Sequence, residues 1–155
     1  MNKAREKVII LLSSFFYIGY CPVASGTAGT LAAFAIFFLI RNHVIAHAVV
    51  MLSMIVLGVC VSTEAEHIYK EKDSHKIVID EVAGYFVTMF LIANPTLWMM
   101  VIGFFLNRIF DILKPYPIRR IEQLHGGLGI MLDDVVAGVY SNICLRLIII
   151  LLTVR

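Results

Sequence analysis

From Val44 to Ser62 the sequence runs without a single Asp, Glu, Lys or Arg. A helix needs about 20 apolar residues to cross the hydrocarbon core of a bilayer, and this stretch is long enough. A second apolar stretch, Ala28–Ile40, comes shortly before it, and only Arg41-Asn42-His43 separates the two. Two apolar segments joined by so short a connection predict a helical hairpin in a membrane.

Three further apolar segments follow, at residues 82–93, 97–106 and 135–154, and Asn94-Pro95-Thr96 separates the first two. None of them shows the alternation of apolar and polar residues that strands of a membrane β-barrel need. Irregular backbone is also costly at membrane depth. The pattern therefore predicts an all-α fold, a polytopic integral membrane helical bundle, with one domain over residues 1–155.

The composition excludes several other classes of protein. Of the 155 residues, 60% are hydrophobic and 15% are charged, against about 45–50% and about 25% in soluble domains. The net charge is only +2 and no basic run with interleaved aromatic residues occurs, so we expect no nucleic-acid partner. Cys21, Cys60 and Cys144 are isolated in the sequence, so we expect neither a disulfide framework nor a structural zinc site.

The N-terminal segment imitates a signal peptide, because basic residues precede the largely apolar stretch Val8–Tyr20. Tyr20 directly precedes Cys21, however, where a lipoprotein signal would carry a small residue. We therefore expect a retained helix that lies at the interface or is partly inserted. His43 and His47, near the first expected turn, are interpreted as interfacial polar residues rather than metal ligands.

Five carboxylates lie next to the apolar segments, although a charge near the bilayer centre costs about 2.5–3.5 kcal/mol. They are the pairs Asp80-Glu81 and Asp133-Asp134, each directly before an expected helix start, and Asp111. Taken singly, each pair is explained by helix capping. A cap needs only one residue, however. If the pairs converge, they repel one another unless a cation neutralises them, and oxygen-only ligation suits Mg²⁺. The expected ligands are Asp80, Glu81, Asp133 and Asp134.

Basic residues lie close to Asp111 in the sequence. Arg108, Asp111 and Lys114 are spaced i, i+3, i+6, which places them near one face of a helix. We expect Arg108 and Lys114 to hold an anionic headgroup, with a positive-inside anchor as the alternative. Arg119 and Arg120 are expected to act as that anchor.

Two glycine-rich segments complete the candidate residues. Gly26-Thr27-Ala28-Gly29-Thr30 opens the first apolar stretch, and glycines at a helix N-terminus let free backbone N–H groups approach a phosphate. Thr27, Gly29 and Thr30 are therefore expected to bind a phosphate group. The second segment, His125–Gly129, is interpreted as a mobile loop.

The same segments resemble the phosphatidylglycerophosphatase A family. The resemblance is carried by Ile-Val-Ile-Asp-Glu at 77–81, by Asn-Arg-Ile-Phe-Asp-Ile-Leu-Lys-Pro-Tyr-Pro-Ile at 107–118 and by His-Gly-Gly-Leu-Gly-Ile-Met-Leu-Asp-Asp-Val-Val-Ala-Gly at 125–138. Pro22–Leu31 is similar to the family's N-terminal motif, which contains Gly-Thr. The match covers most of the chain, in order and with compatible spacing.

The resemblance implies a Mg²⁺-dependent lipid phosphatase of the bacterial inner membrane with its site facing the cytoplasm. Such an enzyme hydrolyses the terminal phosphate monoester of phosphatidylglycerophosphate to phosphatidylglycerol and phosphate. The catalytic carboxylates it implies are Asp80, Glu81, Asp111, Asp133 and Asp134. Two alternatives are a family member acting on another lipid phosphate and a small ion-coupled membrane transporter, since broken helices and intramembrane carboxylates also mark ion pathways.

Residues 82–106 allow two topologies. A single kinked span is long enough to cross a bilayer, but it puts Asp80 and Glu81 on the opposite side from the other three carboxylates. A hairpin broken at Asn94-Pro95-Thr96 keeps all five together and keeps most Lys and Arg residues cytoplasmic, in line with the positive-inside rule. We therefore predict the hairpin, with five membrane-embedded passes and with Arg41 and Arg155 outside.

Overall fold

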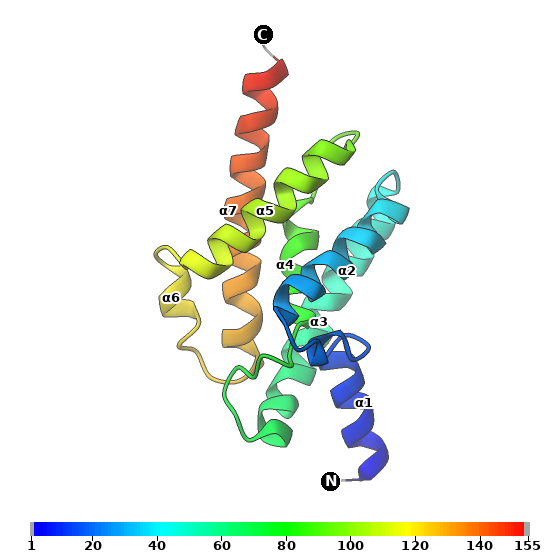
Figure 1. The fold of residues 1–155 in the computed structure, drawn as a ribbon, viewed down its shortest axis with the longest axis vertical. Helices are drawn as coiled ribbons and strands as arrows, with labels where there is room; N and C mark the ends of the chain where they lie inside the picture. The colour runs from blue at the N-terminus through cyan, green and yellow to red at the C-terminus, as the bar shows by residue number, and fades with distance from the viewer. Residues whose placement is uncertain (1, 154–155) are drawn as a thin grey trace.

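The computed structural model describes residues 2–153, and this part of the chain is helical, with no strand. Its elements are α1 (Lys3–Ser13), the 3₁₀ turn η1 (Ile18–Tyr20), α2 (Ser25–Ile40), α3 (Val44–Tyr69), α4 (Ile79–Thr88), α5 (Leu97–Leu113), α6 (Ile118–Ile121) and α7 (Gly127–Thr153) (Figure 1). The predicted all-α fold is confirmed, and α3 and α7 are long and apolar enough to cross a membrane. The predictions for Val154 and Arg155 lie outside the described residues.

The predicted N-terminal hairpin consists of α2 and α3, joined by the turn at residues 41–43 (Figure 1). With 26 residues, α3 is about 39 Å long, which exceeds the hydrocarbon thickness of about 30 Å. Its last turns carry Glu64 and Glu66, and the helix ends where Lys70 adopts a left-handed conformation with φ 55°. The helix therefore continues beyond its apolar stretch.

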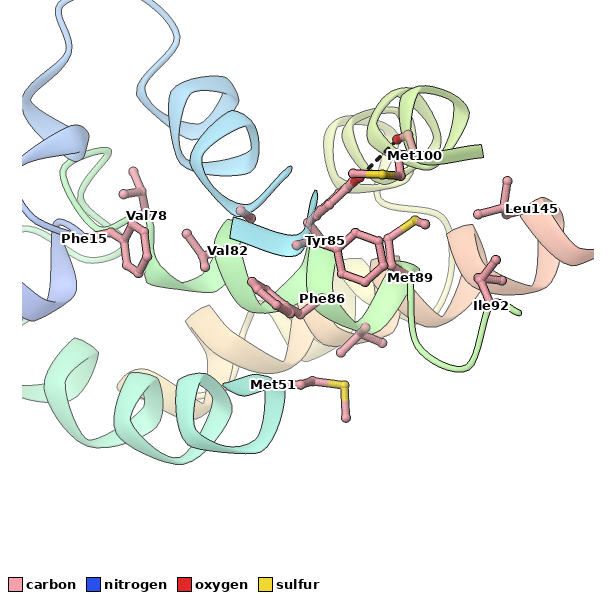
Figure 2. Close-up of a cluster of buried hydrophobic side chains, with 13 residues drawn as sticks. Phe15, Met51, Val78, Val82, Tyr85, Phe86, Met89, Ile92, Met100 and Leu145 are labelled. Atoms are coloured by element: carbon pink, nitrogen blue, oxygen red, sulfur yellow. Dashed lines mark hydrogen bonds between the residues drawn. The ribbon is translucent and has the colours of Figure 1, made fainter. Parts of the chain in front are cut away.

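The central helix of the fold is α4. It packs against α2, α3, α5 and α7, and all of its residues are buried except Glu81, which is half-buried. Val82, Tyr85 and Phe86 extend from it into the apolar cluster of Figure 2. There the Tyr85 hydroxyl donates to the carbonyl oxygen of Met100 on α5 at 3.1 Å. A helix enclosed by protein on all sides is apolar around its whole circumference, as α4 is beyond its first turn.

The hairpin predicted within residues 82–106 is confirmed, because α4 and α5 run in opposite directions (Figure 1). With 10 residues, α4 rises about 15 Å, about half the hydrocarbon thickness. The break comes earlier than Asn94, because α4 ends at Thr88 and residues 89–96 form the connection.

Side chains of α7 satisfy the carbonyl groups of this connection. The Asn142 amide donates to the carbonyl oxygens of Thr88 and Phe90 at 2.8 and 2.9 Å. The Arg146 guanidinium donates to those of Phe90 and Leu91 at 2.9 and 2.8 Å. Non-helical backbone at membrane depth is tolerated where protein supplies such partners. Arg146, unusual in an apolar segment, therefore has a structural role at the hairpin connection.

His47 is not an interfacial residue, as we had interpreted it, but lies in the protein interior. Its ring is buried, and Nε2 lies 2.8 Å from the carbonyl oxygen of Phe86 near the end of α4. Because a carbonyl oxygen only accepts, Nε2 carries the proton and donates. His47 thus supports the end of the half-length helix, whereas His43 is exposed at the turn.

The start of the last helix was predicted wrongly. We expected it near Val135, whereas α7 begins at Gly127, so part of the expected loop His125–Gly129 is helical. Gly126 ends the preceding loop with φ +66°, and the backbone N–H of Gly127 donates to the Thr63 hydroxyl of α3 at 2.8 Å. These interactions anchor the first turn of α7. Asp133 and Asp134 therefore lie well inside the helix and do not cap it.

Candidate active site

Three carboxylates from two helices meet at one point of the fold. Asp111 lies near the end of α5, and Asp133 and Asp134 lie in the second turn of α7, which packs against α5. One oxygen from each carboxylate lies within 4.8 Å of the others. Asp133 and Asp134 are each only 3% exposed, and the Asp134 backbone N–H donates to Asp133 Oδ1 at 3.0 Å. Three anionic groups this close favour a bound cation.

The other predicted pair, Asp80 and Glu81, lies in the first turn of α4 and makes no side-chain cap of the helix. Asp80 is 5% exposed, and it lies within electrostatic range of Glu81 and Asp133. Glu81 lies within electrostatic range of Asp111 and Asp134. The antiparallel course of α4 and α5 thus brings all five predicted carboxylates to one region.

The tightest group differs from the predicted ligand set. Asp111, which we did not predict as a ligand, joins Asp133 and Asp134 in it, whereas Asp80 and Glu81 lie outside it. Among the described residues, Asp80 Oδ1, Glu81 Oε2 and Asp134 Oδ1 are buried and have no hydrogen-bond partner. Unpartnered buried carboxylate oxygens, with no nitrogen or sulfur donor in the group, fit a hard cation such as Mg²⁺.

The two basic residues predicted to bind phosphate both contact these carboxylates. Arg108 Nη1 lies 3.0 Å from Asp111 Oδ2 and 4.0 Å from Glu81 Oε1. Lys114 Nζ lies 2.8 Å from Asp133 Oδ2 and 2.8 Å from Glu122 Oε1. Burial alone would lower the pKa of Lys114, but its hydrogen bonds to both carboxylates outweigh that effect and raise the pKa above its ordinary value. Lys114 is therefore a permanent cation at physiological pH.

The predicted glycine-rich segment contributes to the site through a residue that we did not single out. Gly26 in the first turn of α2 lies against Glu81 and Arg108, and an added Cβ would collide with the Glu81 carboxylate. Gly29 instead packs against Val78, and the buried Thr30 hydroxyl donates to the Gly26 carbonyl oxygen at 3.0 Å. These are contacts within α2 and with Val78, and the phosphate-binding role of Gly29 and Thr30 stays a prediction.

The remaining predicted residues lie further from the carboxylates. Thr27 is half-buried in the first turn of α2. Arg119 is exposed and, with Lys72, Asp73, Glu122 and Gln123, lines an open cavity of about 490 Å³. Arg120 lies over the Tyr116 ring at 5.2 Å. These positions leave the predicted phosphate-binding role of Thr27 and the anchoring role of the two arginines as predictions.

Sequence reasoning missed two polar residues next to the cluster. Glu122 forms an ion pair with Lys114, and Asn107 is fully buried beside Asp134. Asn107, Asp111 and Lys114 are spaced i, i+4, i+7, so they share one face of α5. That spacing was the available signal for Asn107, whereas nothing local in the sequence marks Glu122.

The fold and these residues define a class: an all-helical membrane protein whose buried acidic cluster and adjacent basic side chains suit the chemistry of phosphate esters. Comparison with known sequences identifies the family within this class. The family model described as phosphatidylglycerophosphatase A matches residues 11–149. The chain belongs to the phosphatidylglycerophosphatase A family, and it is a phosphoric monoester hydrolase.

Individual relatives agree with this assignment. A phosphatidylglycerophosphatase A of Escherichia coli (strain K12) is 37% identical over 134 residues, which cover 84% of this chain and 77% of the relative. One from Haemophilus influenzae is 44% identical over 72 residues, or 46% of this chain and 44% of the relative. A Bacteroides thetaiotaomicron protein provisionally named phosphatidylinositol-3-phosphatase is 34% identical over 142 residues, or 86% of this chain and 89% of the relative. No solved structure matches the chain.

Proposed function

We propose that this hydrolase is a Mg²⁺-dependent phosphatase that converts phosphatidylglycerophosphate to phosphatidylglycerol and inorganic phosphate. The observation that carries the proposal is the group formed by Asp111, Asp133 and Asp134, whose oxygens lie within 4.8 Å of one another, with Lys114 in contact with one of them. The E. coli and H. influenzae relatives support the substrate, because both are named phosphatidylglycerophosphatase A.

In this proposal Asp111, Asp133 and Asp134 hold the cation. When bound, Mg²⁺ supplies a Lewis acid that offsets phosphate charge and lowers the pKa of a water molecule. Arg108 and Lys114 bind the non-bridging phosphate oxygens, for which they exchange part of their contacts with carboxylates. Charge-assisted hydrogen bonds of this kind are short and strong.

Hydrolysis of the monoester adds one water and breaks the bond between phosphorus and the glycerol oxygen. One proton leaves the attacking water, and one proton reaches the departing alkoxide. Asp80 and Glu81 lie outside the tight group of three and keep unpartnered oxygens among the described residues. We assign proton transfer to this pair, because a carboxylate free of the cation is able to accept a proton from the water and to return one to the alcohol.

The proposal places the site at the cytoplasmic face of the bacterial inner membrane in a multi-pass protein. The N-terminal end of the chain and the loop at residues 70–78 lie toward one end of the molecule, α6 lies nearer the middle, and the turns at 41–43 and 89–96 lie toward the other end (Figure 1). The segments at the first end and in α6 carry more Lys and Arg residues than the two turns, in which Arg41 is the one residue of these two types. The positive-inside rule therefore supports a cytoplasmic orientation for that end, to which the carboxylates belong.

A second substrate has a specific observation in its favour. The B. thetaiotaomicron relative, aligned over most of both chains, is provisionally named phosphatidylinositol-3-phosphatase. Both lipids end in a phosphate monoester, so the carboxylates and basic residues serve either one. The sequence also allowed an ion-coupled transporter. Because the protein is a phosphoric monoester hydrolase, its buried charges are explained by phosphate chemistry without an ion pathway.

The deciding experiment measures phosphate release from the purified protein in detergent micelles. The panel contains phosphatidylglycerophosphate, phosphatidylinositol 3-phosphate and phosphatidic acid, each with Mg²⁺ and with EDTA. We expect phosphatidylglycerophosphate to have the highest kcat/KM, and EDTA to abolish turnover until Mg²⁺ is restored. A higher kcat/KM for phosphatidylinositol 3-phosphate would show that this lipid, and not phosphatidylglycerophosphate, is the preferred substrate. Full turnover in EDTA would show that the enzyme does not depend on a divalent cation.

A further inference from the structure

Asn107 is the buried polar side chain that the proposed chemistry leaves unused. It is 0% exposed, and within residues 2–153 neither its Oδ1 nor its Nδ2 has a hydrogen-bond partner. A carboxamide in such surroundings costs free energy in two places, because one acceptor and one donor group both lose their hydrogen bonds to water. An apolar side chain of similar size would avoid that cost. The position therefore indicates a partner that the side chain meets in the working enzyme.

The surroundings of Asn107 identify that partner. On α4, Gly84 has no side chain, and both helices beside it come close: Asn107 Nδ2 of α5 lies 3.2 Å from the point where a Cβ would stand. Asp134 Oδ1 of α7 lies 3.3 Å from the same point. The amide and the carboxylate thus face one small space next to Gly84. Asp134 Oδ1 is itself buried and without a partner in the described chain.

The two unpartnered groups are chemically complementary, because Nδ2 donates and a carboxylate oxygen accepts. An Asn107–Asp134 hydrogen bond would satisfy Asp134 Oδ1 and fix the rotation of the carboxylate. One Asp134 oxygen belongs to the group with Asp111 and Asp133, so a carboxylate held in one rotation would be presented to that group in one fixed geometry. Residues that orient ligating carboxylates in this way typically change metal affinity about 10- to 100-fold when they are lost.

We propose that Asn107 is a positioning residue of the cation site, which donates from Nδ2 to Asp134 Oδ1 and so presents Asp134 to the cation. The inference rests on the proposed function, because it assumes that Asp111, Asp133 and Asp134 hold a divalent cation. It assigns to Gly84 the role of leaving room for the pair. Asn107 does not touch the substrate in this arrangement.

The test measures Mn²⁺ binding to the purified protein in detergent, without substrate, by electron paramagnetic resonance. Asn107→Leu keeps the shape but loses the donor, and Asn107→Asp replaces the donor with a repelling carboxylate. We expect both variants to bind Mn²⁺ about 10- to 100-fold less tightly than the wild type. Asn107→Asp should have the lower affinity of the two. Thr88→Val is the matched control: it removes a buried hydroxyl that donates to the Gly84 carbonyl oxygen of its own helix, and Mn²⁺ affinity should stay within about 2-fold.

Stability and a second variant separate the outcomes. Thermal unfolding without metal shows whether Asn107→Leu is folded, so that a loss of Mn²⁺ binding by a folded variant reports on the cation site. Tighter Mn²⁺ binding by Asn107→Asp would overturn the proposal, because it would show that the side chain at position 107 contacts the cation directly and does not donate to Asp134. If Asp134→Asn loses Mn²⁺ while Asn107→Leu binds like the wild type, the positioning role alone is wrong. If Asp134→Asn also binds like the wild type, the proposed cation site itself is wrong.

Discussion

Lys114 Nζ lies 2.8 Å from Asp133 Oδ2, and this ion pair joins the end of α5 to the second turn of α7. Lys114 also contacts Glu122, which follows α6, at 2.8 Å. The backbone of Lys114 is left-handed, with φ 42°, so it ends α5 while its side chain turns toward the carboxylates. Lys114 therefore both ends α5 and places its own ammonium group beside the carboxylates of Asp111, Asp133 and Asp134.

Replacing Lys114 should weaken substrate use strongly. Lys114→Met removes one charge-assisted hydrogen bond to phosphate, a contribution of about 1.5–3 kcal/mol, so kcat/KM should fall about 10- to 150-fold. The change should be measured as phosphate release over a range of lipid concentrations. Arg119→Met, in an exposed arginine that lines the neighbouring cavity, is the control and should lose less than about 3-fold. Equal small losses in both variants would remove the phosphate role of Lys114.

The carboxylates should each be required for turnover but not for folding. Asp133→Asn and Asp134→Asn should lower kcat by at least about 10²-fold, the scale of losing one electrostatic stabiliser of a transition state. Asp80→Asn and Glu81→Gln should behave in the same way if they transfer protons. Activity in Mg²⁺ and thermal unfolding in detergent give the two readouts. Near-normal activity in all four variants would refute a carboxylate site.

The hairpin was predictable from the distribution of charges, because a single span would have separated Asp80 and Glu81 from the other carboxylates. Its bounds were not. Residues 89–93 are apolar, and apolarity does not distinguish a membrane helix from a connection embedded in protein. That connection is stabilised by Asn142 and Arg146, which lie far along the chain. No local pattern reveals such long-range hydrogen bonds.

The site was predictable in part as a set of residues, but not as a geometry. The cost of burying charge singled out the five carboxylates, and the spacing around Asp111 pointed to Arg108 and Lys114, whereas Gly29 and Thr30 contact other parts of α2 and Val78. Which three carboxylates come closest depends on how α5 packs against α7, and this packing placed Asp111 with Asp133 and Asp134. Asn107 was missed because an uncharged amide in an apolar helix is less conspicuous than a carboxylate.

The hairpin connection should depend on Asn142. Asn142→Leu removes the donor to the carbonyl oxygens of Thr88 and Phe90, so the free energy of unfolding should fall by about 1–3 kcal/mol. Trp98, the only tryptophan, lies in the first turn of α5 and reports unfolding of this region by fluorescence in detergent. Ile143→Leu, at an exposed neighbouring position, should leave the unfolding free energy unchanged. Identical curves for both variants would show that the amide is dispensable.

The orientation in the membrane should follow the hairpin. Single cysteines replace exposed residues in a chain without Cys21, Cys60 and Cys144, two of which are themselves exposed. Glu71 precedes α4 in the sequence and Gln123 follows α5. Both side chains are exposed, so both positions are suitable for labelling.

With α4 and α5 as a hairpin, the loop before α4 and the loop after α6 lie on the same side of the membrane. Glu71→Cys and Gln123→Cys should therefore both react with a membrane-impermeant maleimide only in inside-out vesicles or after permeabilisation. Asn94→Cys, exposed in the connection between the two helices, should not show this pattern, because the connection lies toward the opposite end of the molecule (Figure 1). Labelling of Gln123→Cys from the outside of intact cells would separate Asp111, Asp133 and Asp134 from Asp80 and Glu81, and it would refute the hairpin and the shared site together.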